Sequence, residues 1–364
     1  MKIEVVSFTG DSGLADYSVS LARALSALVR TTVVTARSLP ARFDQLGFEV
    51  LRVFRRSRHY PIDLFRFLFG VLRRRPAWVI FQGPLKFALL DGLCVRTLRV
   101  FGIQCCITVH DVLPHYPRPW SKTTFGFYYR SFDRVICHSQ SAKAGVEALG
   151  VRAPILVVPH GIYDIFNLTQ ISQQAAREKI PGIEPQDFVT LFFGHLEPRK
   201  GLLEFLTCAK QFADVPRFKF LLAGASSVAG HGPQYAAALN EAKLMPNVVL
   251  HDRRIPFEEV ENFVAASNVI SLPYLEGTTS GVLKIALAFA LPVVATRVGD
   301  FPEQVPAGAG LFIDADNQIA TNLGLALREM EQNYDQFQTA MSVAGQDAQW
   351  PLIAQQLLDF LQRK

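Results

Sequence analysis

Short runs of β-branched and aromatic residues alternate with longer amphipathic stretches along most of this 364-residue chain. The runs in the first half are Ile3–Phe8, Thr31–Ala36, Val79–Gln82, Gln104–Val109, Arg134–Cys137 and Ile155–Val158. The stretches between them carry apolar residues at helical spacing and are Leu14–Leu28, Leu64–Arg74, Phe87–Val100 and Ala142–Leu149. Strand-like runs separated by helix-like stretches predict a parallel sheet with helices on both faces.

The alternation pauses between His160 and Asp187, where glycine and proline gather, and then restarts. The later strand-like runs are Val189–Phe193, Phe218–Leu222, Val248–Leu250, Val269–Leu272 and Pro292–Thr296. A chain of this length exceeds one ordinary core. We therefore expect an α/β protein with two Rossmann-like domains, over residues 1–165 and 187–348, joined by a connection over residues 166–186.

Composition excludes a disordered chain, because 49% of the residues are apolar and only 19% are charged. The cysteines lack the spacing of a zinc or redox motif, and Cys105 and Cys106 lie in an apolar run where buried free thiols are expected. The opening MKIEVVSFTG is typical of a strand rather than a signal peptide. The most apolar segment, Ile285–Thr296, has about 12 residues, and a bilayer span needs roughly 20. We expect a soluble, cytoplasmic protein.

Charge divides unevenly between the two halves of the chain. Residues 1–176 hold 22 Lys and Arg against 11 Asp and Glu, a net charge of +11. Residues 177–364 hold 15 against 21, a net charge of −6, and the two values sum to the +5 of the whole chain. A basic first half indicates an anionic partner, for which nucleic acid, a membrane surface and a phosphorylated substrate are the candidates.

Two junctions between a strand and a helix in the second half carry polar residues that suit a diphosphate. In the first junction Gly194 ends a strand, and Arg199 and Lys200 stand where the next helix begins. Cations are electrostatically misplaced at a helix start, so a bound anion explains them better than solvation does. In the second junction Glu276 precedes small residues at the start of the apolar helix Val282–Ala290. Their amides and hydroxyls suit an anion, although a simple capping segment has the same composition.

These segments, in this order, resemble the retaining glycosyltransferases of family 4. The similar segments are TGDSGLADYSVSLARAL (9–25), ITVHDVLP (107–114), VVPHGIYDIF (157–166), FFGHLEPRKGL (192–202), SNVISLPYLEGTTSGVLKIALAFALPVVAT (267–296), VGDFPE (298–303) and WPLIAQQLLDFL (350–361). The resemblance implies the two-domain GT-B fold, with the donor diphosphate in the cleft between an acceptor-binding first domain and a donor-binding second domain. It also implies that a final helix, residues 349–364, packs back toward the first domain.

The resemblance implies a role for each matching residue. Lys200 would clamp the donor phosphates, Glu276 would hold hydroxyls of the donor sugar and His110 would lie beside the anomeric centre, so these three are the expected catalytic residues. Arg254 and Ile255 would grip the base through backbone contacts. The other expected substrate-binding residues are Gly10, Gly13, Asp16, Asp111, Gly194, His195, Arg199, Thr278, Thr279, Ser280, Gly281 and Val282.

The sequence departs from the family pattern at two positions. Ile285 stands where the family has the glutamate that holds the nucleotide ribose, and His195 stands where many members have an arginine. The first departure matches a branch with a single glutamate in the donor-site motif, of the type that assembles bacterial polysaccharide. His138 has no evident partner, and His160 is expected to shape the segment between the domains.

The resemblance implies transfer of a sugar from a nucleotide-diphosphate sugar to a hydroxyl of a saccharide or lipid-linked acceptor, with retention. No metal or other cofactor is expected, because fixed cations stabilise the diphosphate. Asp314 and Asp316 form a D-x-D pattern, but a helix-capping loop explains it better. An epimerase or hydrolase acting on nucleotide sugars and a decayed sugar-nucleotide-binding subunit are the alternatives.

A basic and aromatic segment in the first domain suggests a membrane surface as a further partner. Arg52, Arg55, Arg56 and Arg58 precede the apolar stretch Leu64–Leu72, and Arg73, Arg74 and Arg75 follow it. Phenylalanines at 65, 67 and 69 exceed what one buried stripe requires, so some of them are expected to be exposed. Peripheral attachment to the inner face of the cell membrane and an ordinary core helix with solvated arginines both fit this pattern. Nucleic acid is not expected as a partner.

Overall fold

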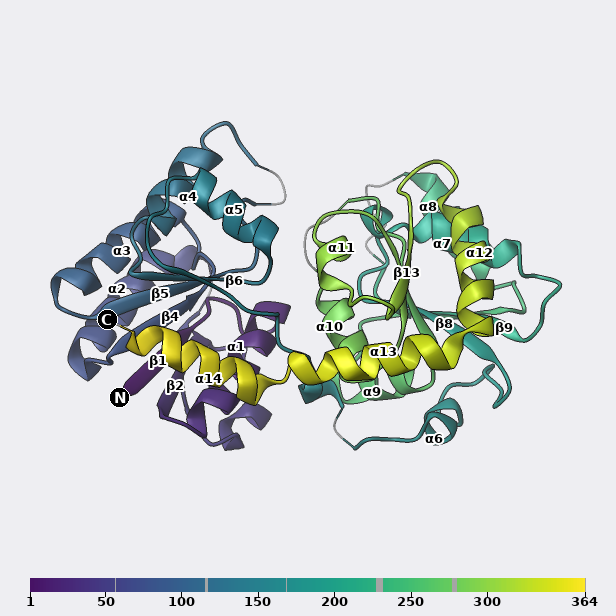
Figure 1. The fold of residues 1–364 in the computed structure, drawn as a ribbon, viewed down its shortest axis with the longest axis horizontal. Coiled ribbons are helices and arrows are strands. Elements are labelled where there is room, and N and C mark those ends of the chain that lie inside the picture. The colour runs from purple at the N-terminus through teal and green to yellow at the C-terminus, as the bar shows by residue number, and fades with distance from the viewer. Residues whose placement is uncertain (56, 115–116, 168, 227–231, 277–279, 364) are drawn as a thin grey trace. The chain divides into compact units, whose positions relative to one another are not determined.

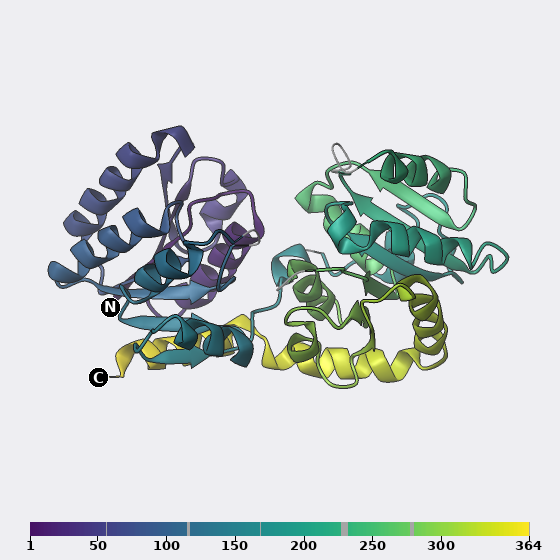
Figure 2. The ribbon, with the colours of Figure 1, turned by 90° about the horizontal axis from the view of Figure 1, so that it is seen from above.

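The computed structural model describes residues 1–55, 57–114, 117–167, 169–226, 232–276 and 280–363. The chain divides into two compact units, one formed by Met1–Gly161 with Ala348–Lys364 and the other by Ile162–Asp347. Each unit is built on one parallel sheet with helices on both faces (Figures 1 and 2). The α/β class and the two Rossmann-like units predicted from the sequence are confirmed.

The first unit holds a seven-stranded sheet in the order β3-β2-β1-β4-β5-β6-β7. Its strands are β1 Lys2–Val6, β2 Arg30–Ala36, β3 Glu49–Phe54, β4 Trp78–Gln82, β5 Gln104–Val109, β6 Arg134–Cys137 and β7 Ile155–Val157. Its helices are α1 Gly13–Ser26, α2 Tyr60–Arg74, α3 Ala88–Val100, α4 Ser121–Tyr129, α5 Gln140–Ala148 and α14 Trp350–Gln362.

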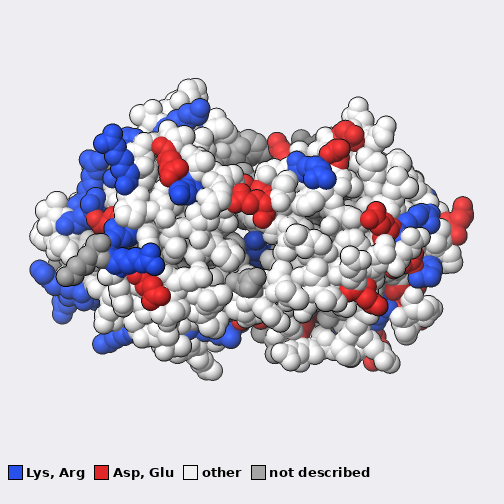
Figure 3. Space-filling model, in the orientation of Figure 1, with Lys and Arg blue, Asp and Glu red and all other residues white. Residues whose placement is uncertain are grey.

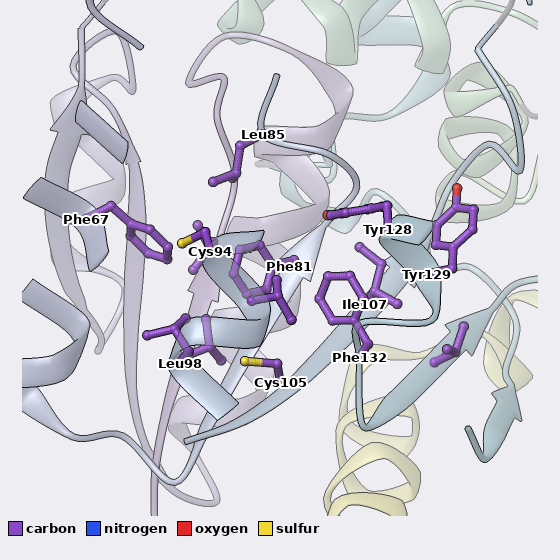
Figure 4. Close-up of a cluster of buried hydrophobic side chains, with 14 of the residues drawn as sticks. Phe67, Phe81, Leu85, Cys94, Leu98, Cys105, Ile107, Tyr128, Tyr129 and Phe132 are labelled. Carbon is purple, nitrogen blue, oxygen red and sulfur yellow. The ribbon is translucent and has the colours of Figure 1, made fainter. Parts of the chain in front are cut away.

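Apolar side chains between the sheet and helices α2, α3 and α4 form a core of the first unit. Phe67 of α2, Leu98 of α3 and Phe132 after α4 meet Phe81 and Ile107 of the sheet (Figure 4). The other face is covered by α1, against which α14 packs (Figure 1). The last helix of the chain therefore completes the first unit.

The second unit holds a six-stranded sheet in the order β10-β9-β8-β11-β12-β13. Its strands are β8 Phe188–Phe193, β9 Phe218–Gly224, β10 Val248–Asp252, β11 Val269–Leu272, β12 Val293–Thr296 and β13 Gly310–Ile313. Its helices are α6 Gln173–Arg177, α7 Leu202–Lys210, α8 Pro233–Ala242, α9 Phe257–Ala265, α10 Gly281–Ala288, α11 Phe301–Gln304, α12 Ile319–Gln332 and α13 Tyr334–Asp347. One hydrophobic core of this unit joins Phe205 of α7 and Phe212, just after that helix, to Phe220 of β9 and Leu323 of α12.

Two strands that the sequence pattern did not predict, β3 and β13, each lie at one edge of their sheet. β3 contains the charged Glu49 and Arg52 and so does not form an apolar run, whereas β13 is a four-residue apolar run that the alternation of strand-like and helix-like stretches did not single out. All five cysteines are buried free thiols, as expected for Cys105 and Cys106. Among the described residues, no helix combines the length and the apolar character that crossing a bilayer requires.

Parallel pairing brings the carboxyl ends of all strands of one sheet to a single edge. In the first sheet β2 and β3 lie on one side of β1 and the later strands lie on the other, so the strand order switches between the neighbours β1 and β4. In the second sheet the same switch occurs between the neighbours β8 and β11. The loops that follow such a pair diverge and leave room outside the sheet, which is where ligands bind in folds of this kind. Each unit therefore has one favoured ligand edge.

Candidate functional site

The two junctions singled out in the sequence meet at the ligand edge of the second sheet. The first follows β8 and the second follows β11, and these strands are direct neighbours. The backbone N–H of Leu275 donates to the carbonyl of Arg199 at 2.8 Å, which joins the two loops. The fold thus brings together residues about eighty positions apart in the chain.

Glycines allow this close approach. Gly201 has φ +76°, and a β-carbon added there would lie 1.9 Å from the carbonyl oxygen of Pro273. Gly194 has φ +93°, and a β-carbon added there would lie 3.1 Å from Nζ of Lys200. Both positions combine a left-handed backbone with a crowded neighbour, so a side chain at Gly201 in particular would push the two loops apart.

Lys200 lies at the meeting point of the two loops and is only 8% exposed. It ends a 3-10 turn, Pro198–Lys200, and its Nζ lies 5.7 Å from the ring centroid of Tyr274. The hydroxyls of Tyr274 and Ser280 are 3.2 Å apart. The lysine is therefore held by packing at the edge of the sheet, beside the residues that lead into α10.

Arg199 and His195 occupy more open positions on the first loop. Nη2 of Arg199 forms an ion pair with Oε1 of Glu197 at 2.8 Å, and the arginine is half-buried. His195 is exposed. Of the two expected cations on this loop, Lys200 is the buried one, while the charge of Arg199 is already compensated by a neighbouring carboxylate.

Helix α10 begins at Gly281, directly after the buried Ser280. Ser280 does not cap the helix with its hydroxyl, so the first amides of α10, including those of Gly281 and Val282, point toward the ligand edge without that side-chain acceptor. Glu276 is exposed at the start of this loop. Thr278 and Thr279 lie outside the described residues.

Lys284, which the sequence analysis did not single out, is a second buried amine on α10. It is 3% exposed, and burial lowers the pKa of its ammonium group to about 7, although the carboxylate of Asp300 opposes this shift. It lies one turn beyond Ser280 and next to Ile285, which occupies the expected glutamate position. A single charged residue in an otherwise apolar helix was the sequence signal for it.

Arg254 and Ile255 follow β10, which is the outermost strand on that side of the second sheet. Arg254 is exposed and Ile255 is half-buried. Both therefore lie at the same edge as Lys200, separated from it by the loop that follows β9.

In the first unit, Gly10, Gly13 and Asp16 lie between β1 and the first turn of α1. A β-carbon at Gly10 would lie 2.4 Å from the backbone nitrogen of Leu39, so the loop packs closely on the segment after β2. Burial raises the pKa of Asp16 to about 7, although the guanidinium of Arg42 opposes the shift. This carboxyl group can carry a proton near neutral pH.

Three histidines gather at the ligand edge of the first sheet. His110 follows β5, His138 follows β6 and His160 lies shortly after β7, and these strands are neighbours. Their rings surround Tyr17 of α1, with ring-centroid distances of 4.7 Å to His110, 5.3 Å to His138 and 4.9 Å to His160. His138 is thus part of a defined cluster rather than an isolated residue. In the sequence, each of these histidines could be noted as a polar residue that follows shortly after a predicted strand.

The imidazole of His110 is held in its neutral form. Its Nε2–H donates to Oε1 of Gln82 at 3.1 Å. Burial lowers its pKa well below the ordinary value, and the neighbouring His138 lowers it further. Asp111, the next residue, is half-buried, and its carbonyl accepts a hydrogen bond from the hydroxyl of Tyr129 at 2.9 Å.

A cavity of about 510 Å³ opens at the same edge of the first unit, beyond β1, β2 and β3. Polar and basic side chains line it, among them Asp11, Ser38, Arg55 and Arg58. The buried carboxylate of Asp63 fixes Arg55 through a hydrogen bond of 2.8 Å from Nε. This cavity suits a polar ligand that carries an anionic group.

Two family models account for most of the chain. The model described as glycosyl transferase 4-like domain matches residues 12–161, and the model described as glycosyl transferases group 1 matches residues 187–333. The second match contains both loops around Lys200, and the first contains His110 and Asp16.

This chain is a glycosyltransferase.

Solved structures show that its fold is the GT-B fold. Sucrose-phosphate synthase from Thermosynechococcus elongatus shares 19% identity with a TM-score of 0.74, covering 99% of this chain and 98% of that one. HepE from Anabaena, in complex with UDP and glucose, shares 16% identity with a TM-score of 0.78, covering 99% of each chain. UDP-GlcNAc 2-epimerase from Neisseria meningitidis, bound to UDP-GlcNAc, shares 14% identity with a TM-score of 0.69 and covers 99% of each chain. No curated protein matches the glycosyltransferase in sequence.

Proposed function

We propose that the glycosyltransferase moves a sugar from a nucleotide-diphosphate sugar to a hydroxyl of a saccharide or lipid-linked acceptor, with retention and without a metal. The observation that carries this proposal is the burial of Lys200 where the loops after β8 and β11 meet. An ammonium group withdrawn from water is costly unless an anion compensates it. A diphosphate at the start of α10 would do so and would also accept hydrogen bonds from the helix amides.

The donor class is further supported by the relatives of the same fold. HepE is solved with UDP, with UDP and glucose and with UDP-glucose. Starch synthase IV from Arabidopsis thaliana is solved with ADP and acarbose. We propose that this enzyme takes a donor of the same chemical class, with Arg254 and Ile255 against the base.

In the proposed reaction the bond between the anomeric carbon and the β-phosphate oxygen breaks, while the acceptor oxygen bonds to that carbon on the same face. The acceptor proton passes to the departing phosphate oxygen. Lys200 and the amides at Ser280, Gly281 and Val282 stabilise the growing negative charge on the diphosphate. Arg199 adds a second cation where it exchanges Glu197 for a phosphate.

The sugar itself is proposed to meet two further residues. Glu276 accepts hydrogen bonds from sugar hydroxyls, and His110 contacts the sugar as a neutral imidazole because burial lowers its pKa. A neutral ring adds no positive charge beside a carbon that itself becomes positive in the transition state. The acceptor is proposed to bind in the cavity lined by Asp11, Ser38 and Arg55, as one step of polysaccharide or glycolipid assembly.

A panel of nucleotide sugars tests this proposal. The purified protein is incubated with UDP-, ADP- and GDP-sugars, with and without saccharide acceptors, and nucleoside diphosphate release and sugar products are measured. We expect one donor class to release nucleoside diphosphate faster with an acceptor, and the new glycosidic bond to keep the donor's anomeric configuration. Inversion at the anomeric carbon would refute the retaining mechanism.

The same assay separates the alternatives. An epimerase is favoured by the shared fold of the 2-epimerase and by the protonatable carboxyl of Asp16, and it would change the sugar or release nucleotide without an acceptor. A decayed binding subunit would bind a nucleotide sugar without releasing nucleoside diphosphate. Either result would replace the proposed transfer.

A further inference from the structure

Helix α2 exposes large apolar side chains to solvent. Ile62, Phe65 and Phe69 are 55%, 69% and 60% exposed, whereas Phe67 is fully buried in the core. The spacing of the three exposed residues, three and then four positions, places them on one side of the helix. The sequence therefore predicted correctly that some of the three phenylalanines would be exposed.

Helix α3, which packs beside α2, continues this surface. Leu89, Leu90 and Leu93 are each between 43% and 54% exposed, and so is Phe87 just before the helix. The ring of Phe87 contacts that of Tyr60 at the start of α2, with centroids 5.6 Å apart, so the two helices begin side by side. We call the surface formed by Ile62, Phe65, Phe69, Phe87, Leu89, Leu90 and Leu93 the α2–α3 face.

The exposed charges within the segment that carries the α2–α3 face have one sign. Residues 55–101 contain ten basic residues and only two acidic ones, Asp63 and Asp91. Both acidic side chains are fully buried, Asp63 against Arg55 and Asp91 against the hydroxyl of Tyr60. Figure 3 shows Lys and Arg side chains gathered along the edge of the first unit, at the left of the view. The exposed charges among the described residues of this segment are therefore positive.

Arginines also share the exposed sides of the two helices. Arg66 and Arg73 follow Ile62 and Phe69 by four positions on α2, so they lie one turn beyond these apolar residues. Arg96 follows Leu93 by three positions on α3 and is exposed. Cations and apolar side chains thus occur together on the α2–α3 face rather than on separate sides.

An anionic bilayer surface fits this combination better than the other partners do. Aromatic and aliphatic side chains enter the boundary between lipid headgroups and acyl chains, while arginines pair with lipid phosphates. Nucleic acid would match the charge but would leave the apolar side chains against a highly polar surface. A second copy of the chain paired symmetrically would place like-charged arginines on facing surfaces, where they repel.

We propose that the α2–α3 face docks this glycosyltransferase on an anionic bilayer surface. The apolar residues supply the attachment at headgroup depth, and the arginines make it selective for anionic lipid. The proposal concerns a surface of the first unit alone, and it is tested without any nucleotide sugar. Its outcome is therefore independent of the proposed transfer reaction.

Vesicle flotation provides the test. The full chain is mixed with vesicles of phosphatidylcholine alone or with a third of phosphatidylglycerol, at low and at 0.5 M salt. We expect binding to the anionic vesicles at low salt and roughly tenfold weaker binding to neutral vesicles or at high salt. Absence of binding to anionic vesicles, or binding that ignores lipid charge, would overturn the proposal.

Matched variants assign the binding to residues. Phe65→Ser with Phe69→Ser, and separately Arg66→Gln with Arg73→Gln, are each expected to lower the partition coefficient about tenfold. Leu244→Ser with Leu325→Ser removes two apolar residues of the second unit that are 84% and 64% exposed, and it should leave binding unchanged. Light scattering of the same samples detects self-association: a dimer that the phenylalanine substitutions dissociate, with no effect on vesicle binding, would assign the face to a second copy instead.

Discussion

The residues that follow the carboxyl ends of the strands differ between the two units. Those of the first sheet form a cluster of histidine and tyrosine rings, and those of the second include buried lysines. His110, His138 and His160 surround Tyr17 in the first unit, and the pKa of His110 is lowered so that its ring is neutral. In the second unit Lys200 and Lys284 are both buried beside the loops that lead into α10. The two parallel sheets are alike in architecture, so the difference lies in the residues that follow the strands.

The net charges of the two halves of the chain do not follow the distribution of the buried lysines. The first half carries +11 and the second −6, yet the buried amines belong to the second. Many arginines of the first half lie instead along α2, α3 and the segments next to them. The net charge of a domain therefore does not report the charge of its ligand edge, and the electrostatics of each edge has to be derived from its own residues.

Among substitutions that test this difference between the two units, we expect the largest loss of turnover at Lys200. Lys200→Ala removes the buried cation, and a charge-assisted contact is worth about 1.5–3 kcal/mol. We expect turnover to fall roughly 10- to 100-fold, because the contact strengthens as the diphosphate leaves. The measurement is the rate of nucleoside diphosphate release at saturating donor.

Two controls accompany this substitution. Lys200→Met keeps most of the side-chain volume and should lose as much activity as the alanine variant. Lys210→Ala removes an exposed lysine of α7 that pairs with Glu241, and it should leave turnover unchanged. A folded Lys200→Ala protein with wild-type turnover would remove Lys200 from the mechanism.

The next largest loss of turnover is expected at His110, in the ring cluster of the first unit. His110→Ala should lower turnover about tenfold and nucleoside diphosphate affinity much less, because we place this ring beside the sugar rather than the phosphates. Turnover by product release and affinity by calorimetry give the two values. Equal losses in both would mean that His110 only supports the end of β5.

Tyr17→Phe is the matched control for this variant. It keeps the ring that packs against His110 at 4.7 Å and removes only the hydroxyl. We expect nearly normal turnover from it. A loss as large as that of His110→Ala would show that the Tyr17 hydroxyl also matters for turnover, so that the effect at this cluster could not be assigned to the imidazole alone.

The sequence predicted most of the fold because most strands are buried on both faces and form apolar runs. β5, β6 and β11 were predicted with the bounds that the structure has, and the edge strands β7 and β10 were also recognised, whereas β3, which contains charged residues, and the short β13 were not. The sequence also indicated that the two loops around Lys200 would act together. It could not predict the ring cluster, because Tyr17 lies more than a hundred residues before His138 and His160, and only the fold brings these segments together.

A smaller effect is expected at Lys284, as a dependence of stability on pH. Its pKa is about 7 in the folded protein because of burial, and the ordinary value is 10.5. Between these values the unfolded chain holds a proton that the folded protein lacks, so this lysine makes stability rise with pH. The expected rise is about 1 kcal/mol between pH 7 and pH 8.

Lys284→Met should remove that rise. The measurement is the free energy of unfolding of the second unit by urea at pH 7, 7.5 and 8, for the wild type and the variant side by side. The difference between the two slopes isolates the lysine, because the other titrating groups are shared. Parallel slopes would show that Lys284 keeps its proton throughout this range.

The smallest expected effect is that of a chelator, which should leave the rate of transfer unchanged. We place the positive charge at the diphosphate on Lys200 and on the amides of α10, so a divalent cation has no role left there. The two carboxylates of the D-x-D pattern have other partners. Oδ1 of Asp314 forms an ion pair with Nε of Arg297 at 3.5 Å, and Oδ1 of Asp316 accepts a hydrogen bond from the backbone N–H of Gln318 at 2.8 Å. Turnover is measured in excess EDTA and again with added manganese or magnesium. Loss of activity in EDTA that the metal restores would contradict this expectation and would assign the positive charge at the diphosphate to a bound ion as well as to Lys200. Asp314→Asn and Asp316→Asn would then test whether these two carboxylates hold the ion.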